Sequence, residues 1–233
     1  MAGRGKSFQL LDFPKFAMPT VTNMDAALTS LNLIDRLGGK SFMSYAPIFA
    51  RLGDFVSGAG SESYIASHLS PYSEPWKNES IQEAGRLLAN YFGSRGGRWY
   101  PHSSKPIRVL GFWFKPSIKG IWFVDGRAYA VLINARKSQR LTTADMRFLA
   151  RGVHELHCID DPNDPTPLII DVSERNIGLG RKLTAHVMSA SDAITLDEFD
   201  AALREFLRAL ALAGVAVPAA TDADSIVSLF KKK

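Results

Sequence analysis

The side chains best suited to chemistry in this sequence are cations and aromatic rings gathered in its middle. Between residues 95 and 151 there are twelve lysines or arginines and only two acidic residues, Asp125 and Asp145. That segment has a net charge of +10 and the rest of the chain −5, which gives the overall +5. A block of one sign inside a folded domain creates a local field that attracts polyanions. Cations for phosphates and flat rings for bases are what a surface that binds single-stranded nucleic acid needs.

The predicted nucleic-acid-binding residues are most of these cations and one ring. They are Arg95, Arg98, Trp99, Lys105, Arg108, Lys115, Lys119, Arg136, Lys137, Arg140, Arg147 and Arg151. The run 136–140 is the strongest candidate, because it ends a predicted strand and precedes a predicted helix N-terminus at Thr142. Cationic side chains and free helix amides both favour an anion there. A merely solvated run of charge is the alternative.

Two further segments could approach a phosphate closely. In 95–100, two glycines allow the backbone near a ligand, two guanidinium groups can each make a forked contact with a phosphate, and the rings can stack. The alternative is a solvated loop with Trp99 packed into the core. Residues 178–182 (Gly-Leu-Gly-Arg-Lys) lack a nucleotide-binding fingerprint but could hold a phosphate through amides and two cations. A plain loop or hairpin is the alternative there.

The elements that must position these residues change character along the chain. Residues 1–22 are expected to form an extended arm that packs either on the chain's own core or on a neighbouring subunit. Residues 23–94 show helical periodicity, with predicted helices at 27–37, 45–56 and 79–92. Strand-like runs follow at 107–114, 118–124 and 129–134, with a hairpin signal at Asp125-Gly126. A helix at 141–158, a short strand at 168–172 and a capped helix at 196–213 complete the pattern. We therefore predict an α+β fold, with a helical N-terminal part and then a small mixed sheet with hairpins flanked by helices. Residues 95–233 form the basic α+β part, which could be continuous with 23–94.

An acidic residue and a later lysine in the strand region could together hold a metal ion. Asp125 is followed by Asn134-Ala-Arg136-Lys137 at the end of the third predicted strand, and a helix and a strand come next. Over about residues 79–173 this order resembles the restriction-endonuclease-like PD-(D/E)xK fold. The resemblance implies a Mg²⁺-dependent nuclease with Asp125, Asn134 and Lys137 in the catalytic positions. Asn134 stands where that family has Asp or Glu, which favours a degenerate binding fold.

The cluster His154, His157 and Cys158 carries metal-type ligands. The two histidines share a helix face, but their spacing is not that of the zinc-protease motif, and no second ligand pair with finger spacing exists. A helix end that packs its histidines is the preferred interpretation. We therefore predict no bound metal or other cofactor, apart from Mg²⁺ under the nuclease alternative.

Composition excludes several classes of protein. The single cysteine, Cys158, excludes an intramolecular disulfide framework and fits a reducing compartment. No apolar run approaches the roughly 20 residues that span a bilayer, and no apolar region follows the basic N-terminus as in a signal peptide. These features predict a cytoplasmic location without membrane association, and the Ala, Arg, Gly and Leu bias resembles that of bacterial proteins.

The leading functional hypothesis is a non-enzymatic protein that binds the phosphate backbone of DNA or RNA. It would be a subunit of a larger bacterial or mobile-element nucleoprotein assembly. The arm 1–22 and the apolar C-terminal segment 215–230 would contact neighbouring protein subunits. The alternatives are the metal-dependent nuclease, and a scaffold or adaptor whose basic face meets an acidic protein.

Overall fold

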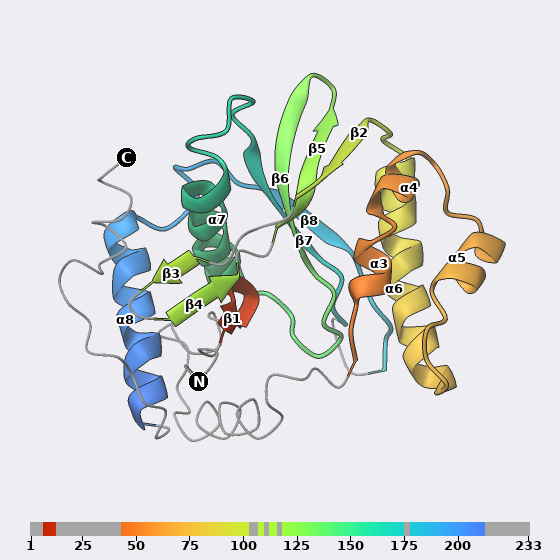
Figure 1. Cartoon of the computed structure of the whole chain (residues 1–233), viewed down its shortest axis with the longest axis horizontal. Coiled ribbons are helices and arrows are strands. Elements are labelled where there is room, and N and C mark those ends of the chain that lie inside the picture. The colour runs from red at the N-terminus through yellow and green to blue at the C-terminus, as the bar shows by residue number, and fades with distance from the viewer. Residues whose placement is uncertain are drawn as a thin grey trace, which may run out of the picture.

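The computed structural model has three layers, with a mixed β-sheet between two groups of helices (Figure 1). It describes residues 7–12, 43–102, 107–109, 112–115, 118–174 and 178–212. On one side of the sheet lie α3 (Ala46–Phe49), α4 (Leu52–Val56), α5 (Glu62–His68) and α6 (Pro75–Gly93). On the other side lie α7 (Thr143–His157) and α8 (Leu196–Leu212).

The central sheet has five strands in the order β2-β5-β6-β7-β8. They are β2 (Arg98–Pro101), β5 (Ile118–Val124), β6 (Arg127–Asn134), β7 (Thr166–Asp171) and β8 (Thr184–Val187). The strands β2, β5 and β6 form an antiparallel meander, α7 crosses over to a parallel β7, and β8 returns antiparallel. Because β6 and β7 are parallel, their carboxyl ends share one edge of the sheet, which the N-terminus of α7 also approaches. This edge carries the candidate site.

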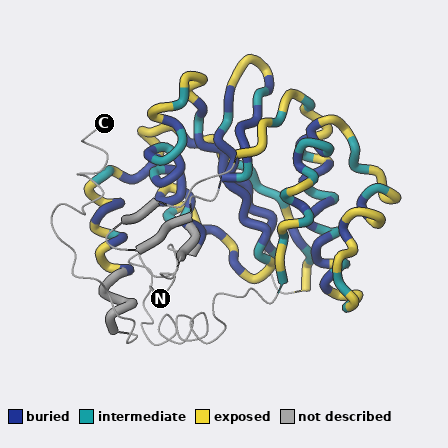
Figure 2. The backbone as a smooth tube through the Cα atoms, viewed as in Figure 1, coloured by how far each residue is buried: buried dark blue, intermediate teal, exposed yellow. Residues whose placement is uncertain are grey.

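Alternate side chains of the central strands enter two different hydrophobic cores. On β6, Ala130 and Leu132 pack under α7 and α8, whereas Val131 and Ile133 pack under α3 to α6. The strands are therefore buried on both faces, which explains their nearly continuous apolar sequences. Figure 2 shows this buried centre in dark blue, with exposed residues on the outer helices and turns.

A second, three-stranded sheet joins the N-terminal arm to the body of the protein. Its order is β1-β4-β3, and β1 (Ser7–Gln9) runs parallel to β4 (Phe112–Lys115), which pairs with β3 (Ile107–Val109). The 3-10 turn η1 (Leu10–Asp12) then buries Leu10 and Leu11 in the core under α7. Residues 7–12 of the arm thus pack on the chain's own core, which was the first of its two expected roles.

The predicted α+β class is confirmed, and several predicted element boundaries change. The run 107–114 is not one strand, because it divides into β3 and β4. Two strands, β2 and β8, lie where no strand was predicted. The predicted helix at 27–37 and the C-terminal segment 215–230 lie outside the described residues. Within the described ranges, no helix is long and apolar enough to cross a membrane.

Candidate functional site

A pocket of about 500 Å³ lies at the shared edge, between the N-terminus of α7 and strand β8. Three structural units line it: the turn into α7, the end of β7, and β8 with the residues before it. The lining residues are Arg140, Leu141, Thr142, Thr143, Met146, Asp171, Ser173, Lys182, Thr184 and His186. Three of them are exposed basic side chains: Arg140 from the turn into α7, and Lys182 and His186 from the β8 segment. Hydroxyl groups and an apolar floor of Leu141 and Met146 complete a lining suited to an anion with some apolar surface.

The acidic residue in this pocket, Asp171, has its carboxylate fully engaged by hydrogen-bond donors. Its Oδ1 accepts from Asn134 Nδ2 at 2.9 Å and from the Ser173 amide at 3.1 Å. Its Oδ2 accepts from the Leu141 amide and from Ser173 Oγ, both at 3.0 Å. Asp171 therefore ties together the ends of β6 and β7 and the turn into α7. Four hydrogen bonds from neutral donors thus stabilise its carboxylate in this position.

The helix N-terminus at the pocket is fixed by a reciprocal capping box. The Thr142 side chain accepts from the Asp145 amide at 3.2 Å, and the Asp145 carboxylate accepts from the Thr142 amide at 2.8 Å. The amides of Thr143 and Ala144 have no carbonyl partner inside the helix, as in any first helical turn. Asp145 reduces the local positive potential, so the exposed cations must supply most of the attraction for an anion.

The predicted run 136–140 lies beside this pocket, but its members have different environments. Lys137 and Arg140 are exposed, and the Lys137 carbonyl accepts from the Glu174 amide at 2.9 Å. Arg136 is half-buried and donates to Gln139 Oε1 at 2.8 Å. The structure therefore brings Lys137 and Arg140 together with Lys182 at one edge of the sheet. The Arg136 side chain, in contrast, is partly used in a hydrogen bond within its own turn.

Arg95 and Arg98 lie at the opposite end of the sheet from this pocket. Arg98 on β2 pairs with Phe123 on β5, and Phe123 pairs in turn with Ala128 on β6. Asn134, at the pocket edge, is six residues further along β6, which corresponds to about 20 Å. The Trp99 ring faces the helical layer, 5.8 Å from the Phe92 ring, and Gly97 lies against the Phe123 carbonyl. Gly97 thus serves close packing within the protein, and Tyr100 is the more exposed ring of this segment.

Lys119 lies on the helical side of the sheet and not at the pocket. Its ammonium group sits 4.2 Å from the centre of the Phe49 ring. Burial, with a contribution from the positive charge of Arg136, lowers the pKa of Lys119 to about 8. The side chains of Lys105, Arg108 and Lys115 lie outside the described residues, although Arg108 and Lys115 belong to β3 and β4.

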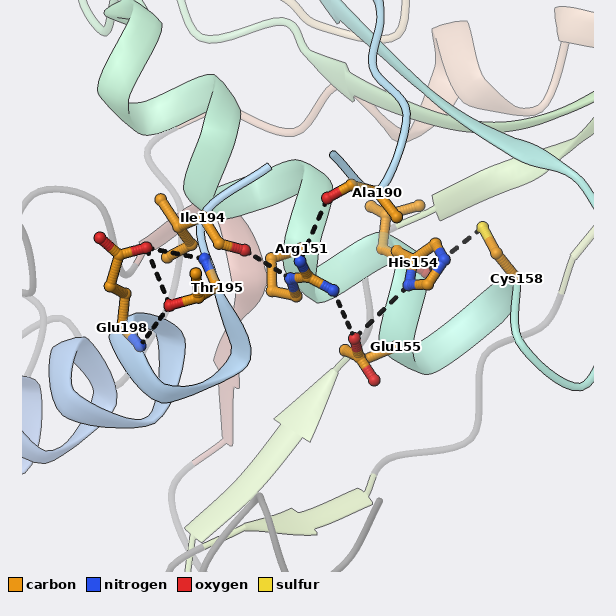
Figure 3. Close-up of polar contacts among 9 residues, drawn as sticks. Arg151, His154, Glu155, Cys158, Ala190, Ile194, Thr195 and Glu198 are labelled. Atoms are coloured by element: carbon orange, nitrogen blue, oxygen red, sulfur yellow. Dashed lines mark hydrogen bonds and ion pairs between the residues drawn. The ribbon is translucent and has the colours of Figure 1, made fainter. Parts of the chain in front are cut away.

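Arg147 and Arg151 are four residues apart on α7, and both hold the loop before α8. Figure 3 shows the contacts of Arg151. Arg151 donates to the carbonyls of Ile194 at 2.6 Å and Ala190 at 3.1 Å, and it pairs with Glu155 at 2.9 Å. Arg147 donates to the Asp192 carbonyl at 3.0 Å. The guanidinium of Arg151 is thereby directed into the protein. Contacts within the chain thus explain the positions of both arginines, Arg147 and Arg151, without reference to a ligand.

The residues that the nuclease resemblance implies do not come together. Asp125 is exposed in the hairpin turn, with φ of 51°, as is usual for a two-residue turn. Asn134 is fully buried at the other end of β6 and donates to Asp171. Separated by the length of this strand, the two side chains cannot ligate one ion. Across the described part of the chain, no group of three or more metal-type side chains is found.

The cluster near the C-terminus of α7 consists of packed side chains. Burial, together with the nearby His102, lowers the pKa of His157 to about 3. Burial and three surrounding carboxylates raise the pKa of Cys158 to about 12, so its thiol is unreactive at neutral pH. His154 contacts the Glu155 carboxylate at 3.4 Å. These environments fit the expectation of a helix end that packs its histidines.

The segment 178–182 divides its two cations between structure and pocket. The Gly178 amide donates to Glu174, and the Arg181 amide donates to Glu83, so neither amide remains for a phosphate. The Arg181 side chain is buried, whereas Lys182 is exposed at the pocket.

Sequence reasoning singled out Lys182 within the run 178–182 but missed Thr184 and His186, although a signal for them exists. Residues 182–187 alternate Lys-Leu-Thr-Ala-His-Val, the period of two that marks a strand with one polar face. That alternation places Lys182, Thr184 and His186 on one face, and all three line the pocket.

The chain matches no protein-family model, and no curated protein sequence is significantly similar to it.

Proposed function

We propose that this protein binds nucleic acid through the phosphate backbone, without catalysing a reaction, at the pocket between α7 and β8. The observation that carries the proposal is the convergence of basic side chains from two distant segments on one pocket: Arg140 from the turn into α7, and Lys182 and His186 from β8 and the residues before it. Lys137 adds a further exposed charge beside the pocket.

The proposed contact is sequence-independent. Arginine and lysine side chains that neutralise phosphates position a strand without reading its bases. Each phosphate neutralised contributes about 0.9 to the slope of log affinity against log salt on duplex DNA, and about 0.7 on a single strand. In the cell, such a protein would act as one subunit of a larger nucleoprotein assembly.

A double variant, Arg140→Ala with Lys182→Ala, tests the proposal. Fluorescence anisotropy with labelled mixed-sequence probes at about 50 and 200 mM salt measures affinity and salt slope together. We expect weaker binding to every sequence and a salt slope smaller by about 1 to 2. The matched control, Arg51→Ala with Arg86→Ala, removes two arginines from the helical layer and should leave affinity within about twofold.

Two outcomes would contradict this function. Equal losses in the pocket variant and in the control would mean that only overall charge matters. Salt-insensitive binding would exclude phosphate contacts. Mg²⁺ in the same titration, with the probes checked for cleavage, tests the nuclease alternative. Competition by heparin but not by nucleic acid of matched charge density would point to the adaptor alternative.

A further inference from the structure

Strand β2 presents a second set of chemically distinctive side chains, far from the pocket. Its residues alternate in direction, so Trp99 packs into the helical layer, while Arg98 and Tyr100 face the other side of the sheet, with His102 next in the same alternation. All three side chains on that face are exposed, and Tyr100 keeps 51% of its surface accessible. We call Arg98, Tyr100 and His102 the β2 row.

The aromatic members of the β2 row are held by rings beneath them. The Tyr100 ring meets Phe123 edge to face, with centres 5.3 Å apart and planes at 80°. The His102 ring lies 5.0 Å from His157, at 85°. Phe123 itself packs against the core under α7. Such supported rings lose little conformational entropy when a planar ligand stacks on them.

Positive charge accompanies these rings. Arg98 is exposed within the row, whereas Arg95, before β2, stacks on Tyr91 of the helical layer, with its guanidinium 4.1 Å from the ring centre. The neighbouring turn between β5 and β6 adds no net negative charge, because its acidic residue, Asp125, is followed by Arg127. The β2 row thus combines one arginine with two supported, exposed rings. This combination suits a strand of nucleic acid, because the arginine can contact phosphates and the rings can stack on accessible bases.

We infer that the β2 row binds the unpaired bases of single-stranded nucleic acid. This inference rests on the proposed function and adds the strand type to it. In a duplex the base faces are stacked on one another and cannot reach Tyr100, whereas in a single strand every base offers a free face. The pocket then contacts phosphates of any strand, and the β2 row discriminates in favour of unpaired bases.

Tyr100→Ala separates the two contacts. A single base–aromatic contact is worth about 1–3 kcal/mol, so affinity for a single-stranded probe should fall roughly 5- to 150-fold. Affinity for a duplex of the same length should change less than about twofold. Tyr100→Phe should retain single-strand affinity, and Trp76→Ala, which removes a similarly exposed ring on α6, should change neither. Thermal unfolding of each variant establishes that the fold is kept.

An abasic oligonucleotide of the same length gives a second readout that a structural defect would not mimic. It has the phosphates but no bases, so wild type should bind it more weakly than the normal strand, and Tyr100→Ala should cause no further loss. The inference is overturned if Tyr100→Ala leaves single-strand affinity unchanged, or if it weakens single-strand, duplex and abasic binding equally.

The same titrations distinguish failure of the inference from failure of the proposed function. Sensitivity to Arg140→Ala with Lys182→Ala but not to Tyr100→Ala would remove the β2 row and leave the pocket. Sensitivity to Tyr100→Ala alone would remove the pocket and leave the β2 row. Wild-type protein that binds none of the three probes would overturn both.

Discussion

At the scale of single residues, adjacent cations have opposite roles, and burial decides between them. Arg181 and Lys182 are neighbours before β8, yet the Arg181 side chain has no exposed surface. Its guanidinium donates to four groups from the helical layer and the strand ends: Ala135 O, Val172 O, Tyr45 Oη and Ser80 Oγ. Arg181 is thus a structural cross-link, while Lys182 remains available at the pocket.

Replacing each of these two cations by methionine should therefore affect different properties. Arg181→Met leaves buried carbonyls without donors and should lower the free energy of unfolding by on the order of 3 kcal/mol. Lys182→Met should change it by less than about 0.5 kcal/mol but weaken nucleic-acid binding. Urea unfolding and anisotropy measure the two effects. Equal destabilisation by both substitutions would contradict the assigned roles.

The half-buried His157 predicts a dependence of stability on pH. Its pKa is about 3 in the folded protein and 6.5 ordinarily, so between these values the unfolded chain binds a proton that the native state does not. This contribution is fully present above pH 6.5 and is lost as the pH falls, at up to about 1.4 kcal/mol per pH unit. His157→Phe should therefore gain stability relative to wild type between pH 7 and pH 5. A constant difference at both pH values would show that His157 protonates in the native state.

At the scale of elements, close packing explains why β2 forms where a loop was expected. Gly120 on β5 lies under the Trp99 ring, and a Cβ built there would come 2.4 Å from the ring and 2.6 Å from the Tyr100 carbonyl. On its other side the same ring lies beside Gly53 of α4, at an ordinary 3.5 Å from such a Cβ. The two glycines let β2 settle between the sheet and the helical layer, a tertiary requirement that local propensity does not reveal.

Alanine at these two glycines provides a matched test. Gly120→Ala must displace Trp99 or the β2 backbone and should cost roughly 1–3 kcal/mol of stability. Gly53→Ala meets no such obstacle and, within a helix, should be neutral or stabilising by up to about 1 kcal/mol. Chemical denaturation checks both. Gly120→Ala at wild-type stability would mean that the ring is not held as described.

At the scale of the whole molecule, the described part of the arm belongs to the chain's own core. Leu10 is 1% exposed, lies against Gly152 of α7, and is followed by Leu11, whose carbonyl accepts from Gln139 at 3.2 Å. These contacts join the N-terminus to the turn beside the pocket. They account for the burial of Leu10 and Leu11 without a neighbouring subunit.

Leu10→Ala should thus destabilise the isolated chain by about 2–5 kcal/mol, as for other buried leucines. The loss should be independent of protein concentration, because the contact is intramolecular. Denaturation midpoints of wild type and variant, measured over a hundredfold range of concentration, test this point. A wild-type midpoint that rises with concentration would assign the arm to an interface between chains.

The sequence by itself determined the class of the fold and most of its elements. Apolar periodicity located α6, β5, β7 and α8 closely, and the capping residues at Thr142 and Thr195 marked true helix starts. These features are local, since each depends on residues within a turn or two of one another. For the same reason the run 136–140 could be recognised as the approach to a helix N-terminus before its surroundings were known.

The tertiary structure decided which cations share a surface. Charge counting along the chain cannot distinguish Arg140, exposed at the pocket, from Arg151, turned onto the carbonyls of Ile194 and Ala190, or from Lys119, buried against Phe49. Nor could it place Lys182 beside Arg140, because that neighbourhood arises when the parallel crossover brings β7 and then β8 to the end of β6. Burial and strand order are set by packing between distant segments. A site assembled from several of them is therefore visible only in the folded chain.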